Sequence, residues 1–468
     1  MVFASLEFLL LFFPLFLIAY AVSPYKARNT VLLGASWVFY GWWSPIFLLM
    51  FIGLTWLTWI GGVALDAPAT PLRRKRILLA FMITVLAGTL CWFKYANILA
   101  ETVNGVLGRV GADPLPWERV LLPIGLSFIV LQAISYLVDV WRGTVKAQRS
   151  FIDFAAYKAM FGQLIAGPII RYEWVQHEIT QRRFDWVGFS KGSRRFMVGM
   201  SMKVLVADSL APVVDAVFAQ SAPSLVDAWI GCSAYTLQLF FDFAGYSAMA
   251  IGIGQMLGFH FPENFNHPYL AHSIQDFWRR WHLSLSSWIR DYLYIPMGGN
   301  RGGTFATYRN LLLTMAIAGL WHGSDSWNFL LWGLAHGMAL CVARAWPQRL
   351  PVPPGLSRLL TLLFVMLAWT LFRAPDMQAA LRMYAGQFGL QGWAMGDTLH
   401  ALLRPGHAAA AVVGVVCVLL PALRPRWEAR HAASRLAAVI ALWPIPAFLL
   451  SFALIASRGA VPFLYFQF

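Results

Sequence analysis

The chain has 468 residues, of which 59% are hydrophobic and only 12% are charged, and its net charge is +15. Soluble domains carry about 25% charged residues, so this composition excludes an ordinary soluble enzyme, a disordered chain and a collagen-like fibre. Long runs without charge recur from one end of the sequence to the other. The composition therefore indicates a single polytopic membrane protein.

Segments long enough to cross a bilayer can be followed along the chain. A spanning helix needs about 20 apolar residues, so we expect about eleven to thirteen transmembrane helices. No alternating pattern typical of a membrane barrel recurs, and the expected fold is all-α. The charge-free segments are 8–25, 29–65, 120–138, 243–262, 326–343, 406–423 and 436–457, and the nearly apolar ones are 77–100, 197–219, 228–242 and 359–372.

The placement of basic residues predicts the topology. Basic clusters alternate with connections that are poor in net positive charge, such as 100–119. The positive-inside rule then places the basic clusters in the cytoplasm and the N-terminus outside. This distribution explains the net charge as a topology signal and argues against nucleic-acid binding. The first segment carries Glu7 and lacks a basic start and a cleavage site, so we expect a retained helix rather than a signal peptide.

Several kinds of site are not supported by the sequence. The four cysteines are scattered through apolar segments without a CxxC pair, which predicts neither a disulfide framework nor a thiolate metal site. The histidines at 260, 267 and 272 do not have metal-ligand spacing, so we expect no metal. A Walker loop and a GxSxG elbow are also absent from the sequence, which argues against an ATP-driven pump and a self-contained serine hydrolase.

Two regions interrupt the apolar pattern. In 151–195, Gly167 and Pro168 break a stretch too short to span, and we expect a re-entrant segment there. In 273–294, apolar residues recur at spacings of three, four and seven, which predicts one amphipathic helix that Ser273 caps. This helix either lies at the cytoplasmic interface, with tryptophans at headgroup depth, or folds inward and lines a site.

His322 is the strongest candidate for a functional residue, because it lies at the junction of two apolar segments, 307–321 and 326–343. An ionisable group beside a span is costly, and a neutral histidine is a good proton acceptor near pH 7. The alternative is an interfacial histidine that is hydrogen-bonded in a loop between tryptophans. His336 is better explained by helix packing. His282 either pairs with His322 or lies on a solvated face.

Several blocks of the sequence together resemble the membrane-bound O-acyltransferase family. The run Asp276–Arg301 resembles the family signature, and Gly319–Gly323, which reads GLWHG, matches the catalytic-histidine motif. The resemblance covers nearly the whole chain and points to the branch that acetylates bacterial alginate or cellulose. The sequence at 324–326 departs from many alginate-type members, which leaves the polymer open. Further matching blocks are 1–3, 39–43, 93–97, 122–128, 165–168, 240–246, 263–266 and 463–468.

The resemblance implies one membrane domain over residues 1–468, with a bundle of helices around a central tunnel. The expected parts are N-terminal helices at 1–150, a re-entrant region at 151–195, a catalytic core at 196–345 and C-terminal helices at 346–468. Family members take an acyl group from a cytoplasmic thioester, which here implies acetyl-CoA. The acetyl group would cross the bacterial inner membrane and reach an exopolysaccharide, directly or through a periplasmic acetyltransferase or acetyl-carrier partner.

The resemblance also implies roles for individual residues. His322 carries over as the essential residue and His282 as the second polar residue of the site. Six residues are expected to line the tunnel: Trp278, Trp281, Trp321, Asn266, Asp242 and Gln163. Four arginines on the predicted cytoplasmic surface are candidates for binding either the CoA phosphates or lipid headgroups, namely Arg279, Arg280, Arg290 and Arg301.

Two other functions compete with the enzyme. A transporter or flippase could export an acylated intermediate and use the histidines as proton relays. Inverted repeats with paired broken helices would favour it, and the sequence has two broken regions but no symmetry between its halves. A scaffold for a secretion complex would leave His322 and His282 unexplained.

Overall fold

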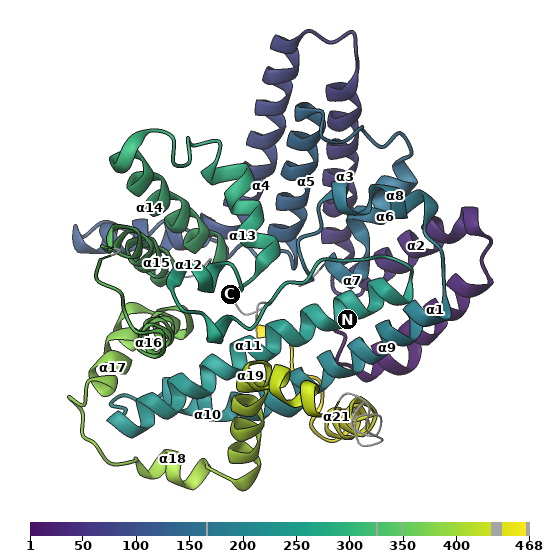
Figure 1. Cartoon of the computed structure of the whole chain (residues 1–468). Coiled ribbons are helices and arrows are strands. Elements are labelled where there is room, and N and C mark those ends of the chain that lie inside the picture. The colour runs from purple at the N-terminus through teal and green to yellow at the C-terminus, as the bar shows by residue number, and fades with distance from the viewer. Residues whose placement is uncertain (165–166, 324–325, 348, 432–441, 465–468) are drawn as a thin grey trace. The chain divides into compact units, whose positions relative to one another are not determined.

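The protein is described from a computed structural model, which covers residues 1–164, 167–323, 326–347, 349–431 and 442–464, with the backbone alone for 423–431 (Figure 1). Parts of several segments named above lie outside the described residues. They are the block 165–168, the sequence 324–326, the charge-free segment 436–457 and the block 463–468.

Every regular element in the described part of the chain is a helix, which confirms the all-α membrane fold. Among the described residues, six helices are long and apolar enough to cross a membrane, and two shorter apolar helices accompany them at Glu7–Val22 and Pro444–Arg458. This measure supports fewer spans than the eleven to thirteen expected from the sequence. Some of the apolar runs begin in irregular backbone: the run at 120–138, for example, becomes helical only at Leu126.

The described helices fall into two compact units. The first comprises Met1–Phe196, Met249–Pro262 and Ile455–Pro462, and the second comprises Met197–Ala248, Glu263–Leu454 and Phe463–Phe468. The expectation of a single domain with four parts stays a prediction.

The first unit is a set of helices packed around aromatic side chains. Its helices are α1 (Phe13–Val22), α2 (Arg28–Gly41), α3 (Pro45–Asp66), α4 (Leu72–Arg109), α5 (Leu126–Arg142), α6 (Phe151–Ala159), α7 (Phe161–Leu164), α8 (Tyr172–Gln181) and most of α9 (Trp186–Ser201), with the π-helix η1 (Glu7–Phe12) and the 3-10 helix η2 (Tyr25–Ala27). The break before α3 follows from the sequence, because Pro45 fits the first turn of a helix and the Ser44 side chain accepts a hydrogen bond from the Phe47 N–H.

In its described residues, the region 151–171 contains only short helices. The helices α6 and α7 have nine and four residues, so neither is long enough to cross a membrane alone, as the Gly–Pro pattern predicts. Buried side chains of this region donate to backbone carbonyls: Lys158 donates to the Ile129 carbonyl of α5 at 2.6 Å, and Tyr157 donates to the Ile170 carbonyl within the region at 2.8 Å. Irregular backbone at membrane depth requires such internal partners.

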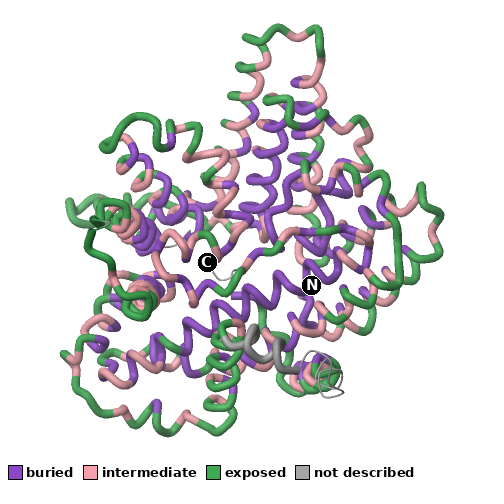
Figure 2. Tube along the Cα trace, viewed as in Figure 1, coloured by how far each residue is buried: buried purple, intermediate pink, exposed green. Residues whose placement is uncertain are grey.

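The second unit contains His282, His322 and most of the remaining helices. They are η3 (Met202–Ala207), α10 (Asp208–Phe218), most of α11 (Leu225–Met256), η4 (Pro268–Leu270), α12 (Ile274–Trp278), α13 (Leu283–Ile289), η5 (Arg290–Tyr294), α14 (Gly303–His322), α15 (Asn328–Ala345), α16 (Pro354–Arg373), α17 (Met377–Gln387), α18 (Asp397–Leu402), α19 (Pro405–His431) and most of α21 (Pro444–Arg458). Figure 2 shows that α11 is buried along most of its length, whereas α19 exposes much of its surface.

The prediction of one amphipathic helix at 273–294 is wrong. The Ser273 side chain caps α12 as expected, but the chain leaves the helix after Trp278 and turns through His282, which has a φ of +44°. A non-glycine residue rarely adopts that conformation unless its surroundings impose it. Two backbone hydrogen bonds to the segment 264–266 hold the turn: Leu283 N–H donates to the Asn264 carbonyl and Asn266 N–H donates to the Arg280 carbonyl, both at 2.9 Å.

Candidate active site

His322 is positioned by close contact between α14 and α15. A Cβ atom on Gly319 would lie 2.2 Å from the Phe329 carbonyl oxygen, and one on Gly333 would lie 2.2 Å from the Met315 carbonyl oxygen. Only glycine allows the two backbones to approach this closely. The contact brings His322, the last residue of α14, beside Trp332 of α15.

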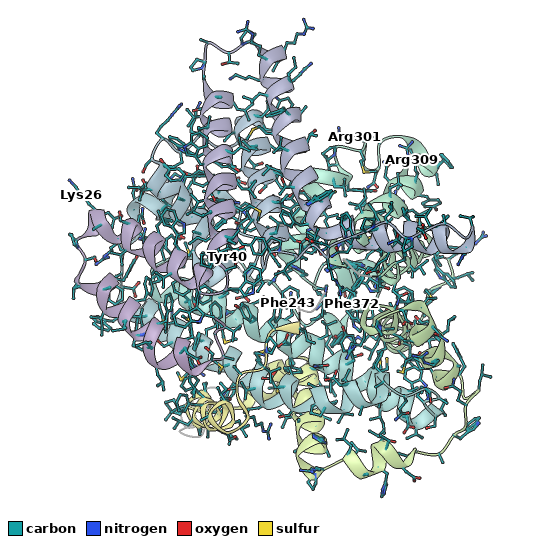
Figure 3. All side chains as sticks on the ribbon, turned by 180° about the vertical axis from the view of Figure 1, so that it is seen from behind. Lys26, Tyr40, Phe243, Arg301, Arg309 and Phe372 are labelled. Atoms are coloured by element: carbon teal, nitrogen blue, oxygen red, sulfur yellow. The ribbon has the colours of Figure 1, made fainter. Side chains whose placement is uncertain are left out.

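Aromatic rings enclose the His322 imidazole. The side chain is buried, and its ring makes edge-to-face contacts with Trp321, Trp332 and Phe372, with centroid separations of 4.9, 5.2 and 5.4 Å. Figure 3 shows Phe372 in the interior of this unit, whereas Arg301 and Arg309 lie at its edge. The rings form a wall around His322 that restricts access of water.

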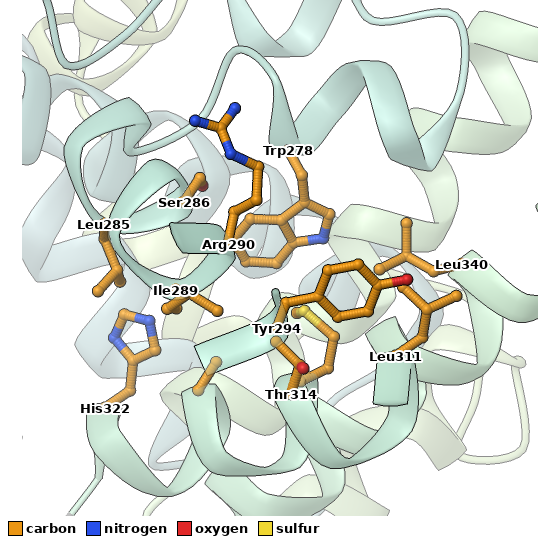
Figure 4. Close-up of a pocket in the computed structure, with 12 residues that line it drawn as sticks. Trp278, Leu285, Ser286, Ile289, Arg290, Tyr294, Leu311, Thr314, His322 and Leu340 are labelled. Carbon is orange, nitrogen blue, oxygen red and sulfur yellow. The ribbon is translucent and has the colours of Figure 1, made fainter. Parts of the chain in front are cut away.

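His322 also lines a cavity of about 140 Å³ (Figure 4). The cavity is lined mostly by carbon, and its polar side chains lie at separate points along it. The lining residues are Trp278 of α12, Leu285, Ser286 and Ile289 of α13, Arg290 and Tyr294 of η5, Leu311, Thr314, Met315, Ala318 and His322 of α14, and Leu340 of α15.

The cavity follows one face of α14. Its lining residues on that helix recur at spacings of three or four positions, with Thr314 and Met315 adjacent, which places them on a single stripe that runs from Leu311 to His322. At a rise of 1.5 Å per residue, this stripe is about 16 Å long. The cavity is therefore elongated and has His322 near one end.

Arg290 is the cationic side chain that lines the cavity. Figure 4 shows its guanidinium extending away from His322. The group is largely exposed, and it donates two hydrogen bonds to the Asp291 carboxylate, from Nε at 2.6 Å and from Nη2 at 3.1 Å. An anion that binds Arg290 must therefore share the guanidinium with Asp291 or displace it.

His282 lies in a different set of contacts. It is fully buried and is not among the residues that line the His322 cavity. Its Nδ1 lies 3.1 Å from Asn264 Oδ1, which also accepts hydrogen bonds from the backbone N–H and hydroxyl of Ser284. The Asn264 amide nitrogen donates to Ser247 Oγ at 3.1 Å. The predicted pairing of His282 with His322 stays a prediction.

The contacts of Asn264 determine the tautomer of neutral His282. The oxygen of Asn264 can only accept, so Nδ1 of His282 carries the proton and Nε2 becomes an acceptor. Within the described part of the chain, Nε2 is buried and has no hydrogen-bond partner. A buried acceptor without a partner is unfavourable by about 1–3 kcal/mol, which makes it a candidate contact for a ligand hydroxyl.

The other three predicted phosphate-binding arginines lie away from the cavity lining. Arg280 forms an ion pair with Asp276, with Nε 2.8 Å from Oδ1, and Arg279 and Arg301 are exposed. Burial alone would raise the pKa of Asp276, but hydrogen bonds from Arg280 and the His272 backbone lower it overall. Their assignment to CoA or lipid phosphates stays a prediction.

The six residues that were predicted to line a tunnel have different surroundings in the structure. Trp278 lines the cavity, while Trp281 and Trp321 are buried among other rings. Asn266 is exposed, and the buried asparagine of its block is Asn264. The two remaining tunnel candidates are Asp242, which pairs with Lys203 at 3.0 Å, and Gln163, which lies in the first unit and donates to the Tyr157 carbonyl. The roles of all six stay predictions.

His336 is buried between aromatic rings, in agreement with a packing role. Its ring lies 4.8 Å from Trp332, 5.1 Å from Phe364 and 5.2 Å from Trp278, between centroids. In the described part of the chain, no group of three or more His, Cys, Asp or Glu side chains could hold a metal ion.

Several residues of the site were missed in the sequence. Thr314 and Ala318 could have been found, because they precede His322 by eight and four positions and so share its helical face. Tyr294 lines the cavity through the π-helix η5, a feature that the apolar pattern does not reveal. Lys203 was detectable as the one basic residue of the nearly apolar segment 197–219, which also contains Asp208 and Asp215.

Comparisons with known proteins identify the family of the chain. The model of the membrane-bound O-acyltransferase family matches residues 8–372. The chain is 42% identical to a probable alginate O-acetylase AlgI of Azotobacter vinelandii, in a match that covers 100% of both chains. It is 45% identical to the protein of the same name from Pseudomonas aeruginosa, over 86% of this chain and 78% of the relative. It is 34% identical to a peptidoglycan O-acetyltransferase of Helicobacter pylori, over 82% and 79%.

Proposed function

The chain belongs to the membrane-bound O-acyltransferase family, and we propose that it transfers an acetyl group from cytoplasmic acetyl-CoA to an exopolysaccharide outside the bacterial inner membrane. The observation that carries this proposal is the narrow apolar cavity that has His322 near one end. The enzyme class follows from the family, whereas the donor, the side of the membrane and the acceptor belong to the proposal.

The shape of the cavity suits a thioester on a pantetheine arm. Such an arm is long and thin, and the cavity follows one face of α14 for about 16 Å. With the acetyl thioester beside His322, the arm would pass Thr314 and Met315 toward Tyr294 and Arg290. The exposed guanidinium of Arg290 could then bind a phosphate of CoA as a charge-assisted contact.

His322 supplies the base for acyl transfer. It takes the proton from the acceptor hydroxyl as the hydroxyl oxygen attacks the thioester carbonyl carbon. The tetrahedral intermediate collapses, the carbon–sulfur bond breaks, and the CoA thiolate receives the proton that His322 holds. The surrounding rings of Trp321, Trp332 and Phe372 exclude water, which would otherwise hydrolyse the donor.

His282 has the chemistry of an orienting group for the acceptor. Its buried Nε2 is an acceptor atom, and a sugar hydroxyl is a donor that would satisfy it. We assign His282 to holding the acceptor and His322 to deprotonating it.

A polysaccharide acceptor is supported by the relatives, because two kinds of bacterial glycan polymer appear in their names, alginate and peptidoglycan. The high identity to the alginate O-acetylases favours an exopolysaccharide such as alginate over a peptidoglycan. Delivery is either direct or through a periplasmic acetyl-carrying partner protein. The alternation of basic clusters supports a periplasmic N-terminus, with the CoA side of the site in the cytoplasm.

Radiolabelled acetyl transfer in proteoliposomes tests the proposal. Purified protein is reconstituted with acetyl-CoA labelled in the acetyl group outside the vesicles and alginate oligosaccharide inside, together with the periplasmic proteins of an acetylating strain. We expect labelled polymer inside and free CoA outside in equal amounts, and neither product with His322→Ala. Label that enters the vesicles while CoA stays acylated would support the transporter instead.

A further inference from the structure

We propose that Phe463 and Leu464, which we call the C-terminal latch, position the His282 imidazole by bracing one turn of α11. The proposal rests on the role of His282 proposed above. Phe463 and Leu464 are buried in the second unit, with 1% and 8% of their surface exposed. They lie about 180 residues from His282 in the sequence, and neither touches the cavity that contains His322.

The first anchor of the latch is a buried ion pair. The Leu464 backbone N–H donates to Asp242 Oδ2 at 2.8 Å. The other oxygen of Asp242 accepts from Lys203 Nζ at 3.0 Å, and the same nitrogen donates to Asp208 Oδ1 at 2.8 Å. Asp242 and Lys203 are each 2% exposed. Buried charges of this kind are tolerated only with near-complete hydrogen bonding, so Leu464 is part of a network that resists rearrangement.

The second anchor is aromatic. The ring of Phe463 lies 4.9 Å from the ring of Tyr246 and 5.5 Å from the ring of Phe243, between centroids. Asp242 and Phe243 are adjacent in α11, and Tyr246 lies about one turn further along the same helix. The ion pair and the ring contacts therefore fix the latch against the same part of the helix.

This stretch of α11 contacts His282 by two routes. The Phe243 ring meets the His282 imidazole edge to face, at a centroid separation of 4.7 Å and an interplanar angle of 87°. Ser247, one turn further on, accepts from the Asn264 amide, and Asn264 in turn holds Nδ1 of His282. Because His282 has a positive φ, its conformation depends on contacts of this kind. Phe463 thus acts through Phe243 as a positioning residue.

Loss of the Phe463 ring would leave a space into which Phe243 can turn. The His282 imidazole would then lose its edge-to-face contact with Phe243, and its Nε2 would no longer point toward the acceptor. Misplacement of a reacting group by about 1 Å can reduce turnover about 100-fold. Acetyl-CoA binding should be unaffected, because neither Phe463 nor Phe243 lines the cavity assigned to the donor.

The test compares Phe463→Ala with Phe51→Ala and Phe463→Leu. Phe51 is a matched control, since it is also 1% exposed and its ring packs on a tyrosine, Tyr40, at 5.3 Å, but it lies in the first unit. We expect Phe463→Ala to reduce kcat by about 10- to 100-fold with an unchanged KM for acetyl-CoA. Phe463→Leu, which fills most of the space, should restore much of the loss.

A second measurement is independent of acetyl transfer. Diethyl pyrocarbonate modifies accessible imidazoles, and peptide mass spectrometry reports the rate at His282. We expect His282 to react about tenfold faster in Phe463→Ala than in the wild type or Phe51→Ala, as local opening becomes easier. Equal rates in all three proteins would overturn the latch even if the enzyme is active. A wild type that modifies no polysaccharide, with faster labelling in Phe463→Ala, would instead refute the proposed function and leave the latch supported.

Discussion

The two histidines of the candidate site are held by two different kinds of structure. His322 ends a regular helix, and close packing of α14 on α15 through Gly319 and Gly333 fixes its position. His282 lies in a turn between short helices, and the hydrogen bond that its Nδ1 donates to the Asn264 side-chain oxygen fixes its position. His322 is therefore positioned by backbone packing, and His282 is positioned by a polar network. Substitutions in the two regions should therefore fail in different ways.

The largest effect on activity is expected at His322, the histidine at the end of α14. His322→Ala removes the general base and should reduce acetyl transfer about 10²- to 10⁴-fold, because proton transfer contributes a factor of that size. The measurement is polymer acetylation by vesicles with matched amounts of protein. His336→Ala is the matched control on the adjacent helix, and its effect should be much smaller because His336 packs between rings. Equal losses in both variants would contradict the assignment.

In the polar network around His282, substitution of Asn264 should reduce activity, whereas substitution of Asn266 should not. Asn264→Ala leaves Nδ1 of His282 without its partner, and we expect a loss of about 10- to 100-fold in kcat from misplacement of the imidazole. Asn266 belongs to the same sequence block but is exposed, so Asn266→Ala should retain activity near that of the wild type. Steady-state kinetics of both variants decides the matter. Equal losses of activity in the two variants would contradict a specific role for Asn264 in positioning His282.

An added methyl group between α14 and α15 should push these two helices apart. In Gly333→Ala the new methyl group would lie 2.2 Å from the Met315 carbonyl oxygen, so α14 must move and carry His322 with it. We expect a decrease of about 1–3 kcal/mol in the free energy of unfolding, together with lower activity. Gly88→Ala in α4 is the control, since a Cβ there meets nothing within 4 Å. Thermal unfolding in detergent should show Gly333→Ala less stable than the wild type and Gly88→Ala unchanged or slightly more stable.

The smallest effect is expected at the ion pair that precedes the His282 turn. The pKa of Asp276 is lowered in the folded protein, so the pair stabilises above the unfolded pKa of about 4 and loses that contribution as the pH falls through the folded value. Arg280→Gln should reduce stability at pH 7 by about 0.3–0.5 kcal/mol, as for other partly exposed pairs four residues apart. The difference between the variant and the wild type should shrink as the pH falls below about 4. A difference that grew in acid would mean that another group is responsible.

The same contrast explains what the sequence can predict. The position of His322 follows from two apolar segments and a motif, because regular helices leave a period in the sequence. The turn at His282 leaves no such signal. It contains neither glycine nor proline, and the hydrogen bonds that hold it come from Asn264, eighteen residues earlier. The apolar spacing of 273–294 therefore predicts a continuous helix that tertiary contacts override.

Contacts between residues that are distant in the sequence could not be predicted either. Asp242 was expected to line a tunnel because the family resemblance implies that role. In the structure it contacts Lys203, 39 residues earlier, and the Leu464 backbone, 222 residues later, and a single sequence does not reveal these pairings. Arg290 could not be separated from Arg279 and Arg280 for a similar reason, because the turn at 279–282 changes which face each side chain occupies.

We place the acetyl end of acetyl-CoA in the cavity beside His322, and alkylation by bromoacetyl-CoA is a direct test of that placement. Ala318→Cys places a thiol on the cavity face of α14, one turn before His322, while Ile317→Cys places one on the exposed face. We expect a covalent CoA adduct on Ala318→Cys that excess acetyl-CoA suppresses, with Ile317→Cys labelled no more than the wild type. Equal labelling of the two cysteines, or labelling of Ile317→Cys alone, would contradict the account.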